Sequence, residues 1–188
     1  MATTTPGAET TLVVARTFAA PREQVFRAWT DPEELKKWWA AGPGFTTPIA
    51  EVDLRIGGRY RLGMKPPDKD VIHVVGGIYR EVQRPSRLVY TWAWEDGDGT
   101  ETLVTVEFRG KGSSTEVVLT HEGLASQESR DQHAHGWTGC LDSLGRLMAA
   151  GTALAVIRAQ QHRTLVRTEQ SRPGSQARGL DLATVEPV

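Results

Sequence analysis

Hydrophobic and polar residues alternate with a period of two over much of residues 49–121, and a β-branched run at residues 11–18 precedes them. Such alternation indicates strands that bury one face. It predicts seven strands, over residues 11–18, 49–54, 58–64, 72–82, 88–94, 102–108 and 115–121. Short Gly-, Pro- and Asp-rich turns separate the last six, which predicts antiparallel neighbours, because a parallel pair needs a crossover of about a dozen residues. Gly76-Gly77 is expected to mark a bulge that bends a long strand.

Two short helices are predicted after the first strand. Pro21 suits the first position of a helix over residues 21–30, because its missing N–H has no partner there. Asp31 is a capping residue for a second helix, which runs on to Trp38 and Trp39.

A third and longer helix is predicted over residues 127–150, with two further turns possible to Ile157. Its apolar residues recur at three- and four-residue spacing: Trp137, Cys140, Leu141, Leu144, Leu147 and Met148. A single long amphipathic helix that follows a run of strands is expected to lie across the open face of their sheet.

Alternation also predicts which side chains face the long helix. Tyr60, Leu62 and Met64 share one face of their strand, and arginines occupy the other. The bulky faces of the last three strands consist of Leu88, Tyr90, Trp92, Trp94, Val104, Val106, Phe108, Val117, Leu119 and His121.

Length and charge narrow the class of protein. A chain of 188 residues supports one domain, expected over residues 10–157, with a flexible leader at 1–9 and a disordered tail at 158–188. Its 22 basic and 23 acidic residues are mixed, so it lacks the basic field that attracts nucleic acid. Its apolar runs fall short of the ~18 residues that span a membrane. A single cysteine fits a reduced, cytoplasmic setting.

Seven stretches, taken in order, resemble a known group of proteins. They are FAAPREQVF (18–26), AWTDPEELKKWW (28–39), DLRIGGRY (53–60), VQRPSRLVYTWAW (82–94), residues 104–108, LTHEG (119–123), and Gly136-Trp137 leading into Leu141 and Leu144. Together they cover about residues 11–149 and are similar to the START-like SRPBCC superfamily. Within it, they resemble the family of proteins similar to the C-terminal domain of the activator of the heat-shock protein 90 ATPase.

The resemblance implies an α+β helix-grip fold of the START/Bet v 1-like kind. In this fold a curved seven-stranded antiparallel sheet surrounds a long C-terminal helix, two short helices follow the first strand, and a cavity lies between sheet and long helix. Members of the superfamily include lipid and hormone binders, polyketide cyclases, a co-chaperone domain, and resistance proteins that enediyne antibiotics consume. Residues after Met148 lie outside the family pattern.

The expected ligand-binding residues are mainly polar-tipped aromatic side chains on the predicted inner faces. Buried tryptophans and tyrosines need a hydrogen-bond partner, which a cavity offers, although ordinary core packing explains any one of them. The full set is Trp39, Tyr60, Leu62, Tyr90, Trp92, Trp94, His121, His133, Trp137, Cys140 and Leu141.

No metal site or cofactor is expected. His133 and His135 are two residues apart, so on a helix they diverge by roughly 200° and cannot bind one ion together. His121 is a candidate acid or base, as happens in cyclases of the superfamily, against the plainer interpretation of a partly exposed histidine at a strand end. Cys140 lacks an activating neighbour in the sequence and is expected to pack as a small hydrophobe.

Three functions follow as hypotheses. The first is a binding protein, not an enzyme, that holds a small hydrophobic or aromatic molecule, in one version to sequester a natural product and protect its producer. The second is an aromatase or cyclase that uses His121 or Tyr90 as a proton shuttle. The third is a protein-interaction domain that binds a chaperone, and a cavity-free interior would favour it.

Overall fold

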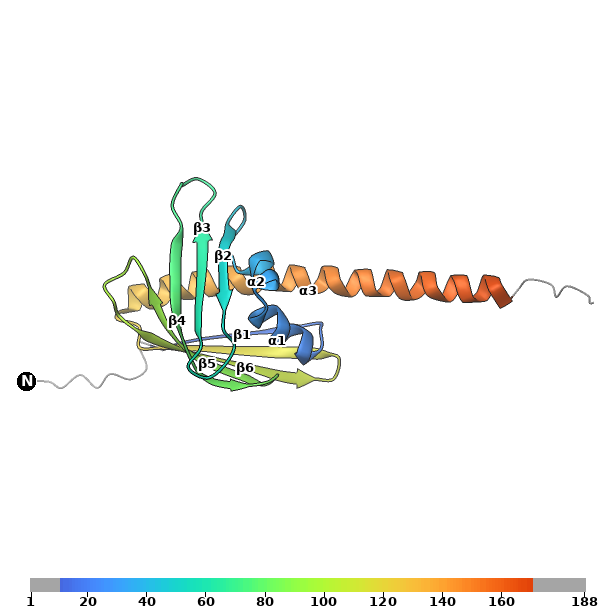
Figure 1. Cartoon of the computed structure of the whole chain (residues 1–188), viewed down its shortest axis with the longest axis horizontal. Helices are drawn as coiled ribbons and strands as arrows, with labels where there is room; N and C mark the ends of the chain where they lie inside the picture. The colour runs from blue at the N-terminus through green and yellow to red at the C-terminus, as the bar shows by residue number, and fades with distance from the viewer. Residues whose placement is uncertain (1–10, 171–188) are drawn as a thin grey trace, which may run out of the picture. The chain divides into compact units, whose positions relative to one another are not determined.

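The computed structural model describes the backbone of residues 11–170 and the side chains of residues 11–154. Its elements follow the predicted order of one strand, two short helices, six strands and a long helix. They are β1 (Leu12–Phe18), α1 (Arg22–Thr30), α2 (Pro32–Trp38), β2 (Thr46–Val52), β3 (Arg59–Lys65), β4 (His73–Gln83), β5 (Arg87–Trp94), β6 (Thr102–Lys111), β7 (Ser114–Glu122) and α3 (Gln127–Gln170) (Figure 1). The predicted helix-grip fold is confirmed.

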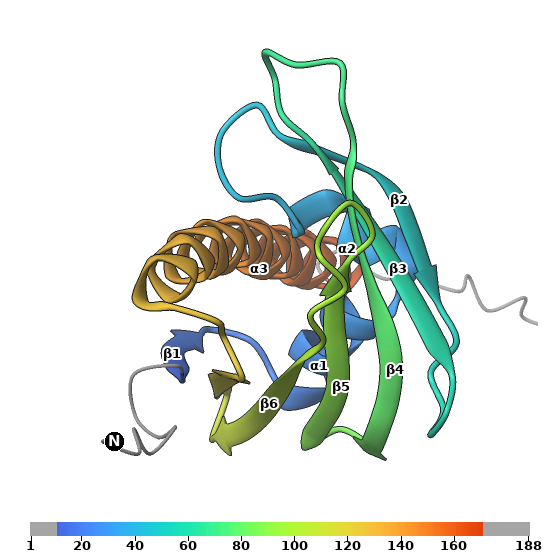
Figure 2. The same ribbon diagram turned by 90° about the vertical axis from the view of Figure 1, so that its left-hand side faces the viewer.

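The seven strands form one antiparallel sheet in the order β1-β7-β6-β5-β4-β3-β2. The sheet curves around the first part of α3, and α1 and α2 lie on the same concave side (Figure 2). The bulge predicted at Gly76-Gly77 lies instead between Tyr79 and Glu81, where the register of β4 against β5 shifts by one residue. Gly77 has a different role, because a Cβ there would lie 1.9 Å from the Thr91 carbonyl oxygen of β5. Only glycine permits that approach.

The second short helix begins where Asp31 predicts, whereas the first begins at Arg22, one residue later than predicted. Pro21 is the N-cap of α1, and Asp31 is the N-cap of α2. The Asp31 carboxylate accepts hydrogen bonds from the backbone N–H groups of Glu33 (2.9 Å) and Glu34 (3.4 Å). These bonds satisfy two of the donors that a helix start leaves unpaired. The chain is thereby turned so that Trp38 and Trp39 point into the core.

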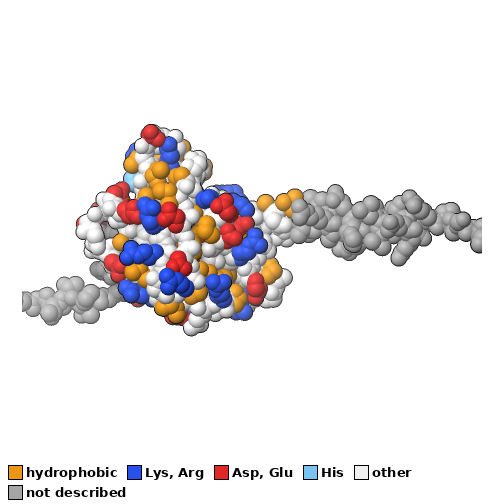
Figure 3. Space-filling model, viewed as in Figure 1, with side chains coloured by type: hydrophobic (Ala, Val, Ile, Leu, Met, Phe, Trp, Pro, Cys, Tyr) orange, Lys and Arg blue, Asp and Glu red, His pale blue; other side chains and the backbone are white. Residues whose placement is uncertain are grey.

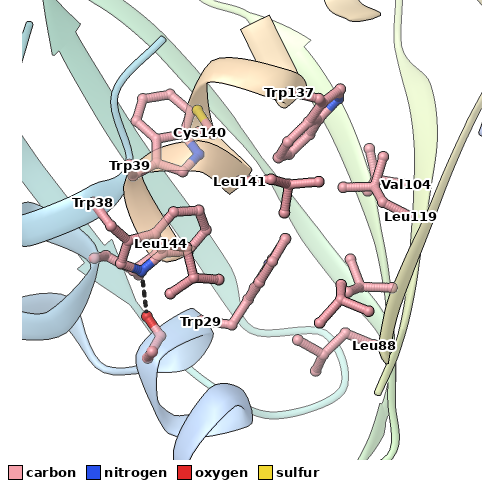
Figure 4. Close-up of a cluster of buried hydrophobic side chains, with 14 of the residues drawn as sticks. Trp29, Trp38, Trp39, Leu88, Val104, Leu119, Trp137, Cys140, Leu141 and Leu144 are labelled. Atoms are coloured by element: carbon pink, nitrogen blue, oxygen red, sulfur yellow. Dashed lines mark hydrogen bonds between the residues drawn. The ribbon is translucent and has the colours of Figure 1, made fainter. Parts of the chain in front are cut away.

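The core lies between the concave face of the sheet and the apolar stripe of α3, as the alternation predicts. Trp137, Leu141 and Leu144 of α3 face Leu88, Val104 and Leu119 of the sheet, with Trp29 of α1 among them, and Cys140 lies beside Trp39 (Figure 4). All of these side chains are buried. The Trp38 indole N–H donates to the Ala28 carbonyl at 2.8 Å, which ties α2 to α1.

The helix α3 is longer than the hydrophobic pattern predicts. It was expected to end at Ala150 or Ile157, and it continues to Gln170. Residues 158–170 of the expected tail are therefore helical, whereas residues 171–188 of it, and the leader at 1–9, lie outside the described residues. The compact unit that contains the sheet ends at Ala153.

Two contacts fix α3 against the rest of that unit. At Gly139 a Cβ would lie 1.9 Å from the Ala41 carbonyl oxygen, so the loop after α2 packs directly on the helix backbone. About one turn further along the helix, Asp142 forms an ion pair with Arg16 of β1. The helix is thus held both to the edge strand and to the loop that follows Trp39.

The surface carries charges of both signs in alternation (Figure 3). On β3, for example, Arg61 pairs with Glu95 at 2.5 Å and with Glu51 at 3.4 Å. Such exposed pairs contribute little to stability, but they agree with the even charge balance of the sequence. In the described part of the chain, no helix has the length and hydropathy needed to cross a membrane.

Candidate ligand-binding site

A cavity of about 250 Å³ lies between the concave face of the sheet and the first turns of α3. Its walls come from the loop after α2, from β3 and β5, and from α3. The lining residues are Trp39, Ala41, Met64, Trp92, Trp94, Gln132, His133, Gly136, Trp137 and Cys140. None of them carries a formal charge when histidine is neutral, so the cavity favours an uncharged ligand.

Trp92 of β5 is the centre of the aromatic wall. Its ring centroid lies 5.0 Å from that of Trp137, 5.7 Å from that of Trp94 and 6.2 Å from that of Trp39. The tilted and edge-to-face geometries of these pairs are the arrangements that aromatic rings prefer. The four indoles therefore hold one another in place and give the cavity a rigid wall.

Most of the buried polar tips of the aromatic core find partners inside the protein. Trp137 Nε1 donates to His121 Nδ1 at 3.2 Å, Trp29 Nε1 donates to the Tyr90 hydroxyl at 3.4 Å, and the Tyr60 hydroxyl donates to the Thr91 carbonyl at 2.7 Å. Trp92 Nε1 is different, because it is buried and has no hydrogen-bond partner among the described residues. An unpaired buried donor costs about 1–3 kcal/mol. A ligand acceptor would relieve that cost.

His121 lies behind the aromatic wall and is completely buried, so the interpretation of it as a partly exposed strand-end residue is wrong. An indole N–H can only donate, so His121 Nδ1 accepts from Trp137 and the ring proton is on Nε2. That Nε2–H donates to the Thr102 hydroxyl at 2.7 Å, and the hydroxyl donates to the Trp92 carbonyl at 3.1 Å. Burial, with His133 nearby, lowers the pKa of His121 to about 3. Both ring nitrogens are occupied, and neither faces the cavity.

His133 stands at one end of the cavity and also lines a second, smaller one. Its Nδ1–H donates to the Ser129 carbonyl at 2.7 Å, so in the neutral ring Nε2 is a free acceptor. The second cavity measures about 130 Å³, and Trp92, Trp94 and His133 line it as well. These three side chains therefore form the wall that the two cavities share.

Six of the eleven predicted residues line the main cavity: Trp39, Trp92, Trp94, His133, Trp137 and Cys140. Tyr60, Leu62 and Tyr90 lie in a separate, tightly packed region, where the remaining void of about 10 Å³ is too small to hold more than a single water. Leu141 and His121 are buried in the core and do not line it. The aromatic face of β5 is thus divided, with Tyr90 in the core and Trp92 and Trp94 at the cavity.

Four lining residues were not predicted: Ala41, Met64, Gln132 and Gly136. Met64 was placed on the correct face of its strand, and Gly136 belongs to one of the family stretches, so the sequence carried a signal for both. Ala41 and Gln132 gave none, because their positions depend on how the loop after α2 and the start of α3 pack.

Cys140 contributes a neutral thiol to the wall. Burial raises its pKa to about 12, so the nucleophilic thiolate is absent at neutral pH. Among residues 11–154, no group of three or more His, Cys, Asp or Glu side chains is arranged to hold a metal ion.

A larger hollow of about 430 Å³ on the outer face of the sheet is a weaker candidate. Its lining includes Glu51, Arg59, Arg61, Glu95 and Glu101, alongside the backbone of β4 at Gly76 and Gly77. Arg61 already pairs with two of these carboxylates. The aromatic cavity, with its unpaired donor, is the stronger candidate site.

Residues 19–149 match the family of Activator of Hsp90 ATPase homolog 1-like proteins. The chain belongs to this family. The match covers strands β2 to β7, both short helices and the cavity-lining part of α3, and it ends where the hydrophobic stripe of α3 ends. No curated protein sequence matches the chain.

Solved structures show the same fold. A protein from Chromobacterium violaceum is 27% identical, with a TM-score of 0.69 over 75% of this chain and 98% of its own. An AHSA1-like protein from Aeromonas hydrophila is 29% identical, with a TM-score of 0.61 over 75% and 94%. An HSP90 activator from Plasmodium falciparum is 23% identical, with a TM-score of 0.58 over 74% and 96%, which establishes likeness of fold alone.

Proposed function

We propose that this member of the family binds a small, uncharged aromatic molecule in the cavity between β5 and α3. The observation that carries the proposal is the uncharged cavity of about 250 Å³ with four tryptophans in its wall. An apolar cavity of about 150 Å³ is enough to bind benzene, so this one has room for a ligand of roughly two fused rings.

The enzymatic alternative, an aromatase or cyclase, requires an acid or base at the ligand. His121 does not line the cavity, has both nitrogens occupied and is neutral at physiological pH. The Tyr90 hydroxyl is buried in the packed core, and burial raises its pKa. Neither proposed proton shuttle can reach a ligand in the cavity, so we favour binding without turnover.

The co-chaperone alternative draws on the family and on the Plasmodium falciparum HSP90 activator, which shares the fold. A protein-interaction domain has no need of an interior cavity, and the cavity found here favours the small-molecule function. Binding of a chaperone by a variant whose cavity is filled would favour the co-chaperone function instead.

The test fills the cavity without disturbing the core. A Cβ at Gly136 meets no neighbouring atom within 4 Å, so Gly136→Leu places its side chain in the cavity. Thr138→Leu adds a similar group on the exposed side of the same helix and is the matched control. Naphthalene should perturb the tryptophan indole N–H signals in nuclear magnetic resonance spectra of the wild type and of Thr138→Leu, but not those of Gly136→Leu. Spectra of the wild type that naphthalene leaves unchanged would sink the proposal.

Sequestration of a reactive natural product is the more specific version of this function. A protein that protects its producer would be cleaved or modified by the compound it binds, and the cavity wall would be the place of attack. Mass spectrometry after incubation with an enediyne should then show a cut or mass-shifted chain, whereas an inert analogue should leave it intact. An unchanged mass in both incubations would limit the function to reversible binding.

A further inference from the structure

Trp92 and His133, on the wall that the two aromatic cavities share, each carry a hydrogen-bonding group that has no partner among the described residues. One is the buried Nε1–H of Trp92, which can only donate. The other is Nε2 of His133, which can only accept, because the Nδ1–H of the neutral ring is committed to the Ser129 carbonyl. The two ring centroids are 6.5 Å apart in an edge-to-face arrangement. A single ligand atom that both accepts and donates can therefore serve both side chains.

We propose that the ligand is a hydroxylated aromatic, bound through a neutral hydroxyl between Trp92 and His133. The hydroxyl oxygen accepts from Trp92 Nε1, its proton is donated to His133 Nε2, and the rings lie against the tryptophan wall. This inference rests on the proposed function, since it names the ligand class of the same cavity.

The charges around the wall favour a hydroxyl over the other common polar groups. Among the side chains that the structure describes, no lysine or arginine lines either cavity, so a carboxylate would be buried without a counterion. Asp98 is the one acidic side chain of residues 11–154 in either lining, and it lines only the smaller cavity. A carbonyl or ether would satisfy Trp92 but would leave the His133 acceptor unpaired.

His121, behind the wall, is not available to pair these groups internally. Its ring centroid lies 4.9 Å from that of His133 and 5.6 Å from that of Trp92. Its two nitrogens are already bonded to Trp137 and Thr102. It therefore has no free acceptor for Trp92 and no free donor for His133.

The experiment compares naphthalene, 2-methoxynaphthalene and 2-naphthol on the full chain, with calorimetry for affinity and nitrogen-15 spectra for the indole N–H groups. The three probes share one ring system. Naphthalene carries no polar group, 2-methoxynaphthalene carries an acceptor, and 2-naphthol carries both an acceptor and a donor. We expect 2-naphthol to bind roughly thirtyfold more tightly than naphthalene, because it forms two hydrogen bonds and each contributes about 1 kcal/mol net. The methoxy compound should fall between them. The Trp92 N–H signal, identified by its loss in Trp92→Phe, should move downfield with the two oxygen-bearing probes only.

Variants separate the two contacts. Trp92→Phe and His133→Leu should each reduce the preference for 2-naphthol over naphthalene to about fivefold, by removal of one of the two bonds. Trp94→Phe trims the same wall but keeps both polar groups, so it should weaken both probes alike and leave the preference intact.

The outcomes distinguish this inference from the function on which it rests. If naphthalene binds and 2-naphthol binds no better, the hydroxyl assignment is overturned and the aromatic binding function stands. An equal preference in wild type, His133→Leu and Trp92→Phe would overturn it as well. If no probe binds, the proposed function fails and the ligand class falls with it.

Discussion

His121 is a neutral ring with its proton on Nε2, because its hydrogen bonds require that state. Its Nδ1 accepts from Trp137, and its Nε2–H donates to Thr102, which in turn donates to the Trp92 carbonyl. A second ring proton would break the bond from Trp137 and place a buried charge beside His133. The histidine thus links β7, β6, β5 and α3 behind the cavity wall.

This link makes stability depend on pH. The pKa of His121 is about 3 in the folded chain and about 6.5 in an unfolded one, so the unfolded state binds more protons between these values. The contribution is complete above pH 6.5 and is lost as the pH falls toward 3, by about 1.4 kcal/mol per pH unit within that window. The free energy of unfolding, measured with urea, should fall by roughly 2 kcal/mol between pH 6.5 and pH 5.

A matched pair of variants assigns the effect. His121→Gln should be less stable at pH 7 but should lose much less stability on acidification than the wild type. His73→Gln removes a histidine outside the core that pairs with Asp96, and it is the matched control for the loss of an imidazole. The same slope in His121→Gln as in the wild type would show that other groups cause the acid sensitivity.

At the scale of elements, α3 depends on two glycines with opposite surroundings. Gly139 touches the Ala41 carbonyl so closely that any Cβ would overlap it, whereas Gly136, one turn earlier, faces open space. Gly139→Ala should therefore force the loop after α2 away from the helix and lower the free energy of unfolding by about 1–3 kcal/mol. Gly136→Ala should raise it by up to about 1 kcal/mol, because alanine is the better helix former.

Chemical unfolding of the two variants and the wild type measures these changes in the free energy of unfolding. A Gly139→Ala variant as stable as Gly136→Ala would mean that the loop yields at no cost. Naphthalene binding gives a second measure, since Ala41 lines the cavity and its displacement should weaken binding in Gly139→Ala.

The elements were predictable because each depends on local signals. The period of two predicted six strands, the β-branched run at residues 11–18 predicted the first, and Asp31 predicted the start of α2, since such signals act over a few residues. The end of α3 was missed because its hydrophobic stripe stops at Met148, while the helix itself runs on to Gln170. Apolar periodicity reports burial, so it cannot mark the end of a helix beyond the core.

The candidate site was only half predictable, for a related reason. Alternation shows that Tyr60, Tyr90 and Trp92 share the inner face, but it gives no position along the sheet at which packing ends and space begins. That boundary is set by Trp29 and Leu35, which fill the region around Tyr90, and by Gly136, which leaves the region near Trp92 open. The pattern of a single strand predicts neither the filled region nor the open one.

At the scale of the whole molecule, the fold and the cavity belong to the unit that ends at Ala153. Every buried hydrophobic side chain in the described part of the chain lies between Leu12 and Met148. A chain that ends after Ala153 should therefore retain the free energy of unfolding to within about 1 kcal/mol and bind naphthalene as the full chain does. Its circular dichroism should lose helical signal only in proportion to the residues of α3 that are removed.

A second truncation is the control for this prediction. A chain that ends after Gly139 lacks Leu141, Leu144 and Met148, whose burial contributes about 1.5–3 kcal/mol each, so it should not fold. Loss of several kcal/mol on truncation at Ala153 would instead show that the residues beyond it stabilise the sheet and the cavity. Retention of stability with loss of naphthalene binding would place part of the ligand site there, because the fold itself would then be intact.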